Sequence, residues 1–456
     1  MRNVNKTYSL YAGMLISIAC LFAFLSGEAM AWFLIAIGLL SPLSIVLPAL
    51  KRKDSFLSVD FWFFGCLFLW SAMYPMDYLL GLELHSPALL QTTTMYALAN
   101  FTCTFFYSFM KKVVLGYKKE SNIPITGLGY TFRFETGMLL VVLGLVFLIY
   151  HVQSLGGLGA IGIENRINNF QKENSGSISV PWQIILSVGL LITASTVKRL
   201  NYYLGFVMIL ALFLIFGFGA RGDVLFVCLP ALLLVMSKKG VITTSFKKIM
   251  ILFFILLFMS PLFTNLRGSV LYNQPLSAYE KYEWAYNRGE TGGAFRVTMD
   301  VVGKAAEADW PKNTYLLESF SFLPSSVYEY FFGQAKFSSD KFFVEHYYPW
   351  QAQHGMSFGF SPVAEAWQLG GYPLIVLVFA IIGVIIAKLN QFKQVIILLP
   401  SLMWFQRVSF DAFANSTFFI VFFYVSAWLL NELLNKNSAR AYRLSASTVT
   451  RWDGGK

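Results

Sequence analysis

Long apolar stretches recur along the chain, and they limit its fold more than any other feature. An α-helix needs about 20 mainly apolar residues to cross a hydrocarbon core of about 30 Å. We count about twelve such stretches, separated by short polar segments. The chain is 56% hydrophobic and 13% charged, whereas soluble domains have roughly 25% charged residues. The sequence therefore predicts an all-α polytopic membrane protein.

The expected membrane spans divide the chain into four regions. They lie at 8–25, 31–50, 60–80, 87–110, 136–151, 180–197, 203–219, 222–236, 249–263, 361–387, 395–406 and 412–434. We interpret the first as a retained helix, because a second apolar run begins at Ala31 without a convincing signal-cleavage context. The expected regions are helices one to nine within 1–263, a large loop at 264–360, helices ten to twelve within 361–434, and a tail at 435–456.

The net charge of +11 does not indicate nucleic-acid binding, because the basic residues form small clusters between apolar runs. Lys and Arg concentrate in every second connection, as expected when cytoplasmic loops carry the excess. This alternation predicts that both termini and the tail are cytoplasmic and that the large loop is external. The four cysteines lie within apolar segments and lack the spacing of a metal or disulfide site.

Arg221 and Asp223 interrupt an apolar run from 203 to 236. A single helix of about 34 residues would be about 51 Å long, which exceeds one membrane crossing. Basic pairs at 198–199 and 238–239 bracket the run on the same predicted side. The run is therefore expected to fold as a hairpin, with Arg221 at its external tip.

The large loop is the expected working part, since it combines charges, Gly, Pro and many aromatic residues. Its segments 277–290 and 294–310 are expected to form short helices. The segment 331–355 is interpreted as irregular.

Three polar groups are expected to precede helices that enter the membrane from outside. They are Arg221, His354 and Arg407. Ser361 is the expected N-cap of the helix that follows His354, with proline at its first turn. The free N–H groups and positive dipole ends of these helices would face outward near two guanidinium groups. This combination suits a multiply charged anion such as a lipid-linked pyrophosphate, which Arg binds through paired hydrogen bonds.

His354 adds a group that accepts a proton near neutral pH, so it is a candidate general base. Glu365 follows it into the next helix and is a candidate for orienting the imidazole or a sugar hydroxyl. Tyr348 and Trp350 offer flat faces for stacking against sugar rings. Structural readings exist for each: loop histidines and interhelical Glu–Arg pairs are common, and loop aromatics often only pack or anchor an interface.

Four segments resemble one known family. They are "GARGDVLF" at 219–226, "SFLPSSVYEYFFG" at 321–333, "QHGMSFGFSPVAEAWQLGG" at 353–371 and "FQRVSFDAF" at 405–413. In this order, and with the many-helix layout, they resemble the Wzy-type oligosaccharide repeat-unit polymerases, which include O-antigen and enterobacterial common antigen polymerases. The N-terminal third contributes only topology to this resemblance.

The resemblance implies a multi-pass glycosyltransferase of the bacterial inner membrane that needs no metal and no cofactor. It would transfer a growing glycan from undecaprenyl pyrophosphate to an undecaprenyl-pyrophosphate-linked repeat unit at the periplasmic face, building lipopolysaccharide or a related surface polysaccharide. The implied partners are these lipid-linked donor and acceptor glycans, the bilayer and a chain-length regulator, but no nucleic acid. The implied catalytic residues are His354, Arg221 and Arg407. The expected substrate contacts are Glu365, Arg267, Arg296, Tyr348 and Trp350.

Other functions fit parts of the same pattern. A flippase or ion-coupled carrier also has about twelve helices, but carriers generally place ionisable groups at the bilayer midplane on interrupted helices. A glycan ligase would use the same pyrophosphate chemistry with a different acceptor. The arginines have structural readings too: Arg221 and Arg407 as snorkelling residues, and Arg267 and Arg296 as solvated or paired residues. A non-catalytic scaffold would leave the placement of Arg and His unexplained.

Overall fold

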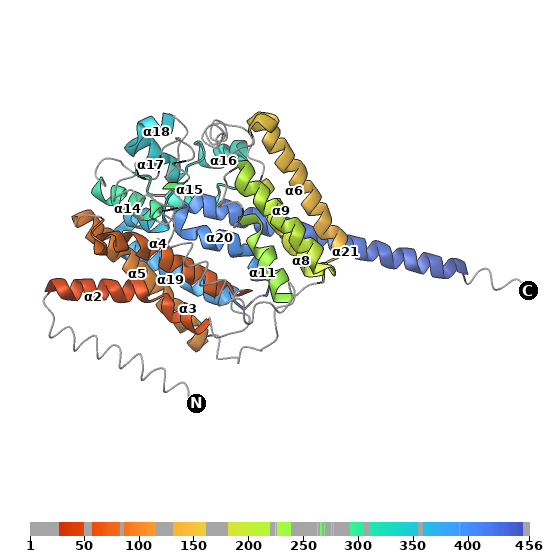
Figure 1. The fold of residues 1–456 in the computed structure, drawn as a ribbon, viewed down its shortest axis with the longest axis horizontal. Coiled ribbons are helices and arrows are strands. Elements are labelled where there is room, and N and C mark those ends of the chain that lie inside the picture. The colour runs from red at the N-terminus through yellow and green to blue at the C-terminus, as the bar shows by residue number, and fades with distance from the viewer. Residues whose placement is uncertain are drawn as a thin grey trace, which may run out of the picture.

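The computed structural model describes most of the chain. It covers residues 27–49, 57–82, 86–114, 131–160, 181–218, 224, 226–238, 262, 265–266, 269, 275, 277, 292–304, 310–353, 359–391 and 393–449. Every regular element in these ranges is a helix, and none of them contains a strand (Figure 1). The predicted all-α class is therefore confirmed for this part of the chain.

Five helical stretches in the described ranges are long and apolar enough to cross a membrane. They are Trp32–Ala49, Val59–Leu79, Phe134–Leu155, Pro362–Leu389 and Phe410–Lys436. Three shorter apolar helices accompany them, at Trp182–Thr196, Leu200–Leu214 and Leu229–Lys238. These helices support a membrane protein, while the count of about twelve spans and the side of each terminus stay predictions.

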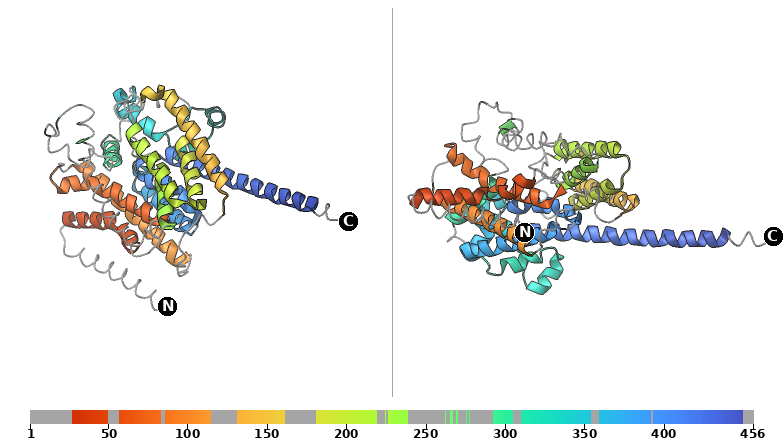
Figure 2. Two further views of the ribbon diagram at one scale, coloured as in Figure 1. Left: turned by 45° about the vertical axis from the view of Figure 1, so that its right-hand side comes forward. Right: turned by 90° about the horizontal axis from the view of Figure 1, so that it is seen from below.

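The helices form two groups with a central pair between them (Figures 1 and 2). The first group consists of α2 (Gly27–Leu40), α3 (Leu43–Ala49), α4 (Val59–Leu79), α5 (Pro87–Phe109) and α19 (Pro362–Leu389). The second consists of α6 (Phe134–Leu155), α8 (Trp182–Thr196), α9 (Leu200–Phe218) and α11 (Leu229–Lys238). Helix α20 (Leu399–Trp404) contacts α4, and α21 (Phe410–Val449) contacts α20, α6 and α8. The C-terminal part of α21 projects away from the body.

The helices of the large loop gather on one side of these groups, at the top of Figure 1. They are α14 (Gly293–Gly303), α15 (Thr314–Ser319), α16 (Ser325–Phe332), α17 (Ser339–Tyr347) and α18 (Pro349–Gln353). Short non-α turns complete the described elements: η2 (Met110–Val114), η3 (Gly157–Ala160), η9 (Lys393–Leu398) and η10 (Phe405–Arg407). The expected helix at 294–310 is confirmed in its first part by α14. The expected helix at 277–290 lies almost entirely outside the described residues.

Two sequence-based expectations are wrong. The segment 395–406 is not one span but η9, α20 and η10 in succession, and α20 has only six residues, too few for a crossing of about 30 Å. The segment 331–355 is not irregular, since it contains α17 and α18. Phe343, Val344 and Tyr347 are buried on one face of α17, and this helical spacing explains why the segment folds. Helix α5 forms as expected, but with its Gln, Asn and Thr residues it is not among the five membrane-length apolar helices.

Helix α11 packs against both α8 and α9, near the two ends of the run that was predicted to form a hairpin. Lys238 at the end of α11 donates from Nζ to the backbone oxygen of Ala194 at 2.8 Å, and also to that of Ser195. These carbonyls lie just before Lys198, so the two basic pairs that bracket the run are at the same end of the bundle. The tip itself, with Arg221 and Asp223, lies outside the described residues.

Helices α6 and α8 pack through glycines that allow close backbone approach. A Cβ added at Gly189 would lie 2.8 Å from the backbone nitrogen of Val141, and one at Gly144 would lie 2.7 Å from Cγ of Leu186. We expect Gly189→Leu to lower the free energy of unfolding by about 1–3 kcal/mol through overpacking. Thermal unfolding in detergent measures this. The matched control is Gly205→Leu on α9, where an added Cβ meets nothing within 4 Å; equal losses in both variants would contradict the prediction.

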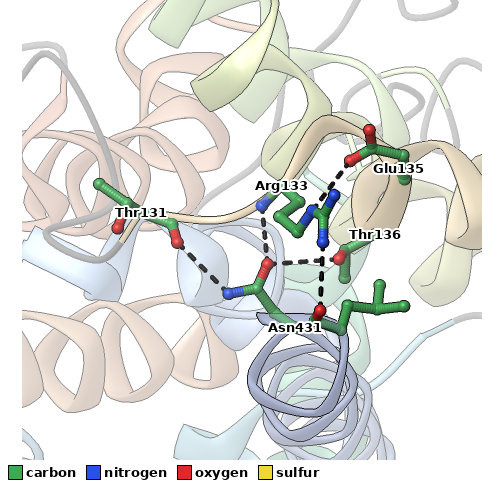
Figure 3. Close-up of polar contacts among 6 residues, drawn as sticks. Thr131, Arg133, Glu135, Thr136 and Asn431 are labelled. Carbon is green, nitrogen blue, oxygen red and sulfur yellow. Dashed lines mark hydrogen bonds and ion pairs between the residues drawn. The ribbon is translucent and has the colours of Figure 1, made fainter. Parts of the chain in front are cut away.

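Helix α21 is apolar from Phe410 to Lys436. Near the C-terminal end of this part, a polar network around Asn431 holds the helix against the start of α6 (Figure 3). Asn431 is fully buried and accepts at Oδ1 from the backbone N–H of Arg133 at 2.7 Å. The Arg133 side chain donates to the backbone oxygen of Leu434 at 3.2 Å and pairs with Glu135. Asn431 lies 21 positions after Phe410, so the two residues are about 31 Å apart along the helix, close to one hydrocarbon thickness. Arg133 and the start of α21 therefore lie at opposite ends of a membrane-length helix.

Candidate functional site

The structure describes part of the predicted site. Five of its residues lie in the described ranges: Arg407, Glu365, Arg296, Tyr348 and Trp350. Three lie outside them: Arg221, His354 and Arg267.

The residues 405–410 form a bend between α20 and α21 that we call the Arg407 turn. It begins with the short helix η10 and leads into α21 at Phe410. The guanidinium carbon of Arg407 lies 5.0 Å from the ring centre of Trp404 and 5.8 Å from that of Trp70 on α4. Both contacts place the guanidinium carbon over a ring, where cation–π attraction holds the cation. Arg407 is therefore fixed by two tryptophans at the head of α21.

The segment before α19 packs directly against the Arg407 turn. The backbone N–H of Phe360 donates to the backbone oxygen of Arg407 at 3.1 Å. Gly359 has φ of 74°, a conformation that favours glycine, and a Cβ added there would lie 2.9 Å from the same oxygen. Two of the segments that carry the family resemblance, 353–371 and 405–413, are thus in contact.

Ser361 caps α19 as the sequence predicts. Its Oγ accepts from the backbone N–H of Val363 at 3.2 Å, and Pro362 occupies the first turn. The hydroxyl of Tyr96 on α5 donates to the same Oγ at 2.8 Å and lies 3.1 Å from Oγ1 of Thr298 on α14. One hydrogen-bonded chain therefore joins a bundle helix, the start of α19 and the large loop.

Glu365 lies beneath the Arg407 turn, and its side chain is fully buried. Its two carboxylate oxygens accept from the backbone N–H of Phe410 at 3.1 and 3.2 Å. The ring of Tyr315 packs edge-on against the Phe410 ring, with centres 5.3 Å apart. The described contacts of Glu365 therefore reach the backbone of the turn that carries Arg407.

Two further acids gather at Glu365 that the sequence analysis missed. Glu318 on α15 is fully buried, and its Oε1 accepts from the backbone N–H of Ser339 at 2.7 Å. Burial, and secondarily the charge of Asp411, raise the pKa of Glu318 to about 7. Asp411 accepts a hydrogen bond from the Ser409 hydroxyl. The sequence offers one weak signal for each acid. Glu318 stands between the apolar residues Leu317 and Phe320 of the large loop, and Asp411 follows Ser409 of the Arg407 turn by two positions.

A second group of predicted residues surrounds α14. The hydroxyl of Tyr348 donates to Oδ2 of Asp300 at 2.6 Å, and Nζ of Lys304 lies 5.1 Å from the Tyr348 ring centre. Burial, reinforced by the hydrogen bond to Asp300, raises the pKa of Tyr348 to about 12. Arg296 is exposed on the same helix, and its charge acts on the Tyr348 hydroxyl. The Trp350 side chain is 58% exposed.

Helix α14 also packs against α19 and η10. The structure therefore brings the Arg296–Tyr348 group and the Arg407–Glu365 group to the same side of the molecule, at the head of α19 and α21.

Comparison with known proteins adds no relative. No family model, no curated protein and no solved structure matches the chain. A proposal about function therefore rests on the residues and their geometry.

Proposed function

We propose that the chain is a polymerase of the bacterial inner membrane. It transfers a growing glycan from undecaprenyl pyrophosphate to a lipid-linked repeat unit at the periplasmic face. The observation that supports this most is the packing of Gly359 and Phe360 against the Arg407 turn, close to where two membrane-length helices begin.

The geometry of Arg407 is compatible with binding a diphosphate. The guanidinium carbon lies over the rings of Trp404 and Trp70, and cation–π attraction does not consume the N–H groups as hydrogen-bond donors. Hydrogen bonds to phosphate use the N–H edges of the guanidinium group, so both interactions can exist together. The N-terminus of α19 is adjacent, and the positive end of its dipole favours an anion nearby.

In the proposed reaction, a hydroxyl oxygen of the acceptor sugar attacks the anomeric carbon of the donor glycan. The bond from that carbon to the pyrophosphate oxygen breaks, and its electron pair leaves with the lipid pyrophosphate. His354 takes the hydroxyl proton. Arg407 and Arg221 stabilise the negative charge that develops on the leaving group. Direct displacement of this kind inverts the anomeric configuration.

The proposal is tested with purified protein in nanodiscs and lipid-linked repeat units isolated from the source bacterium. A polymerase yields a ladder of products with increasing repeat number. Transfer to a different acceptor, with one addition only, would instead indicate a ligase. Translocation of the lipid-linked glycan across vesicles without extension would indicate a flippase.

An ion-coupled carrier is a second candidate, favoured by a break in α19. The helix is interrupted at Gly370 and Gly371, and Gly371 has φ of 63° and ψ of −154°. The buried carboxyl of Glu365 lies between one and two turns before this break. Interrupted helices with buried carboxyls are typical of carriers. Proton movement into vesicles that depends on an added glycan, without any extension product, would favour this function.

A further inference from the structure

We propose that Glu365 and Glu318 are positioning residues: as a hydrogen-bonded carboxyl pair, they hold the Arg407 turn against the large loop in the arrangement that binds a diphosphate. This inference rests on the proposed function. In this inference, Glu365 holds the Arg407 turn in place. The sequence analysis had expected it to orient the His354 imidazole or a sugar hydroxyl. We call Glu365 and Glu318 the carboxyl pair.

The carboxyl pair connects three separate parts of the chain. Glu365 belongs to the first turn of α19 and accepts from the backbone of Phe410, three residues after Arg407. Glu318 belongs to α15 and accepts from the backbone of Ser339 at the start of α17. Because each acceptor holds a backbone N–H, movement of either carboxyl shifts a chain segment as well as a side chain.

One oxygen in the pair indicates that the two carboxyls share a proton. Oε2 of Glu318 is buried and, within the described residues, has no hydrogen-bond donor. Two side chains interact with this carboxyl, the hydroxyl of Ser339 and the carboxyl of Glu365, and only the second can carry a shared acidic proton. Two ionised carboxylates have no hydrogen to share, whereas one proton between them satisfies the buried oxygen. Like charges at such separation also cannot both ionise without a large free-energy cost.

If both carboxyls of the pair were ionised, the groups that face them would not neutralise the two negative charges. Asp411 faces it from α21, Tyr315 from α15 and Tyr328 from α16. The charge of Asp411 acts on both members of the pair. In the part of the chain that the structure describes, neither carboxyl forms an ion pair with a basic residue. The shared proton is therefore the feature that keeps the pair together.

This arrangement predicts a definite direction of pH dependence. The pKa of Glu318 is raised from 4.5 to about 7, so the folded arrangement binds a proton that the unfolded chain has lost in this window. The linked stability is fully present below pH 4.5 and is lost as the pH rises through about 7. Above it, two adjacent carboxylates repel each other and release the turn.

The test measures binding of undecaprenyl pyrophosphate to the full chain in nanodiscs between pH 5.5 and 8.5. We expect the wild-type affinity to fall up to about tenfold per pH unit above 7. Ionisation of the ligand's own phosphate has the opposite sign, because it adds negative charge. Thermal unfolding is measured on the same samples, so that the pair is observed independently of the ligand.

Three variants separate positioning from general damage. In Glu365→Gln, the amide can donate to Oε2 of Glu318 and still accept from Phe410 N–H. It should therefore bind within about threefold of wild type at pH 6 and lose the pH dependence. Glu365→Ala removes the acceptor and should bind at least about tenfold more weakly. Glu329→Gln, on the exposed face of α16, is the control and should match wild type.

The outcomes distinguish this inference from the proposed function. Equal effects of Gln and Ala at position 365, or a pH profile that Glu365→Gln leaves unchanged, would overturn the carboxyl pair. If Glu365→Ala does not fold, the pH profile of Glu365→Gln still decides. If wild type binds no undecaprenyl pyrophosphate but its thermal stability falls above pH 7 in a way that Glu365→Gln abolishes, the shared proton stands and the proposed function fails.

Discussion

Replacing Arg407 by alanine is expected to reduce glycan extension by a factor of about 10² to 10³, the usual loss when one group that stabilises developing charge is removed. The guanidinium group is held against Trp404 and Trp70 at the head of α21, so in the proposed reaction it would need little reorganisation as charge develops on the leaving pyrophosphate. Arg407→Lys should recover only part of the activity, because an ammonium group lacks both the flat stacking face and the paired N–H edges.

The measurement is the initial rate of ladder formation at saturating donor, with folding checked by thermal unfolding. Lys341→Ala is the matched control, since Lys341 is an exposed cation on α17 in the same large loop. The control should leave the rate within about twofold of wild type, as expected for a surface substitution. If the rate of Arg407→Ala stays near that of wild type, Arg407 takes no part in the reaction.

Gly359→Val is expected to lower the rate of extension by at least about tenfold. A Cβ at this position would lie 2.9 Å from the backbone oxygen of Arg407, which is backbone and cannot move independently of the turn. The contact would break the hydrogen bond from Phe360 N–H to Arg407 and displace the turn by several tenths of an ångström. Displacements of about 1 Å near a reacting group can cost 10²-fold in rate.

Backbone strain needs its own control, because φ at Gly359 is 74° and a β-branched residue is strained there whatever the space. Gly333→Val provides it. Gly333 has φ of 67°, but an added Cβ meets nothing within 4 Å. Both variants should lose similar stability from strain, about 1–2 kcal/mol, and only Gly359→Val should lose activity beyond that. Equal loss of activity in both would mean that the turn is not the sensitive element.

The fold class was accessible from the sequence because apolar length is a strong signal. The helix at Pro362–Leu389 and its Ser361 cap agree with expectation. The segment 395–406 misled because its apolar composition is equally suited to a short buried helix: Leu399 and Leu402 are buried against neighbouring helices rather than exposed to lipid. Composition alone does not separate these cases, and length is the better guide.

The contact between Gly359 and Arg407 could not be read from the sequence, although both residues stand in segments singled out by resemblance. They are 48 residues apart, and only the packing of α19 against the Arg407 turn brings them together. The carboxyl pair was missed for a similar reason. Glu318 and Glu365 come from a loop helix and a membrane helix, and a single sequence carries no signal for their approach.

The most direct test of the account is a structure of the protein in nanodiscs with undecaprenyl pyrophosphate bound, determined by electron cryo-microscopy. Hydrogen bonds between Arg and phosphate oxygens have lengths of about 2.7–2.9 Å. The account predicts a diphosphate oxygen at such a distance from the guanidinium group of Arg407. Arg221 and His354 should line the same site, at the periplasmic face of the inner membrane. A diphosphate bound elsewhere, or an Arg407 turn that opens toward the cytoplasm, would contradict it.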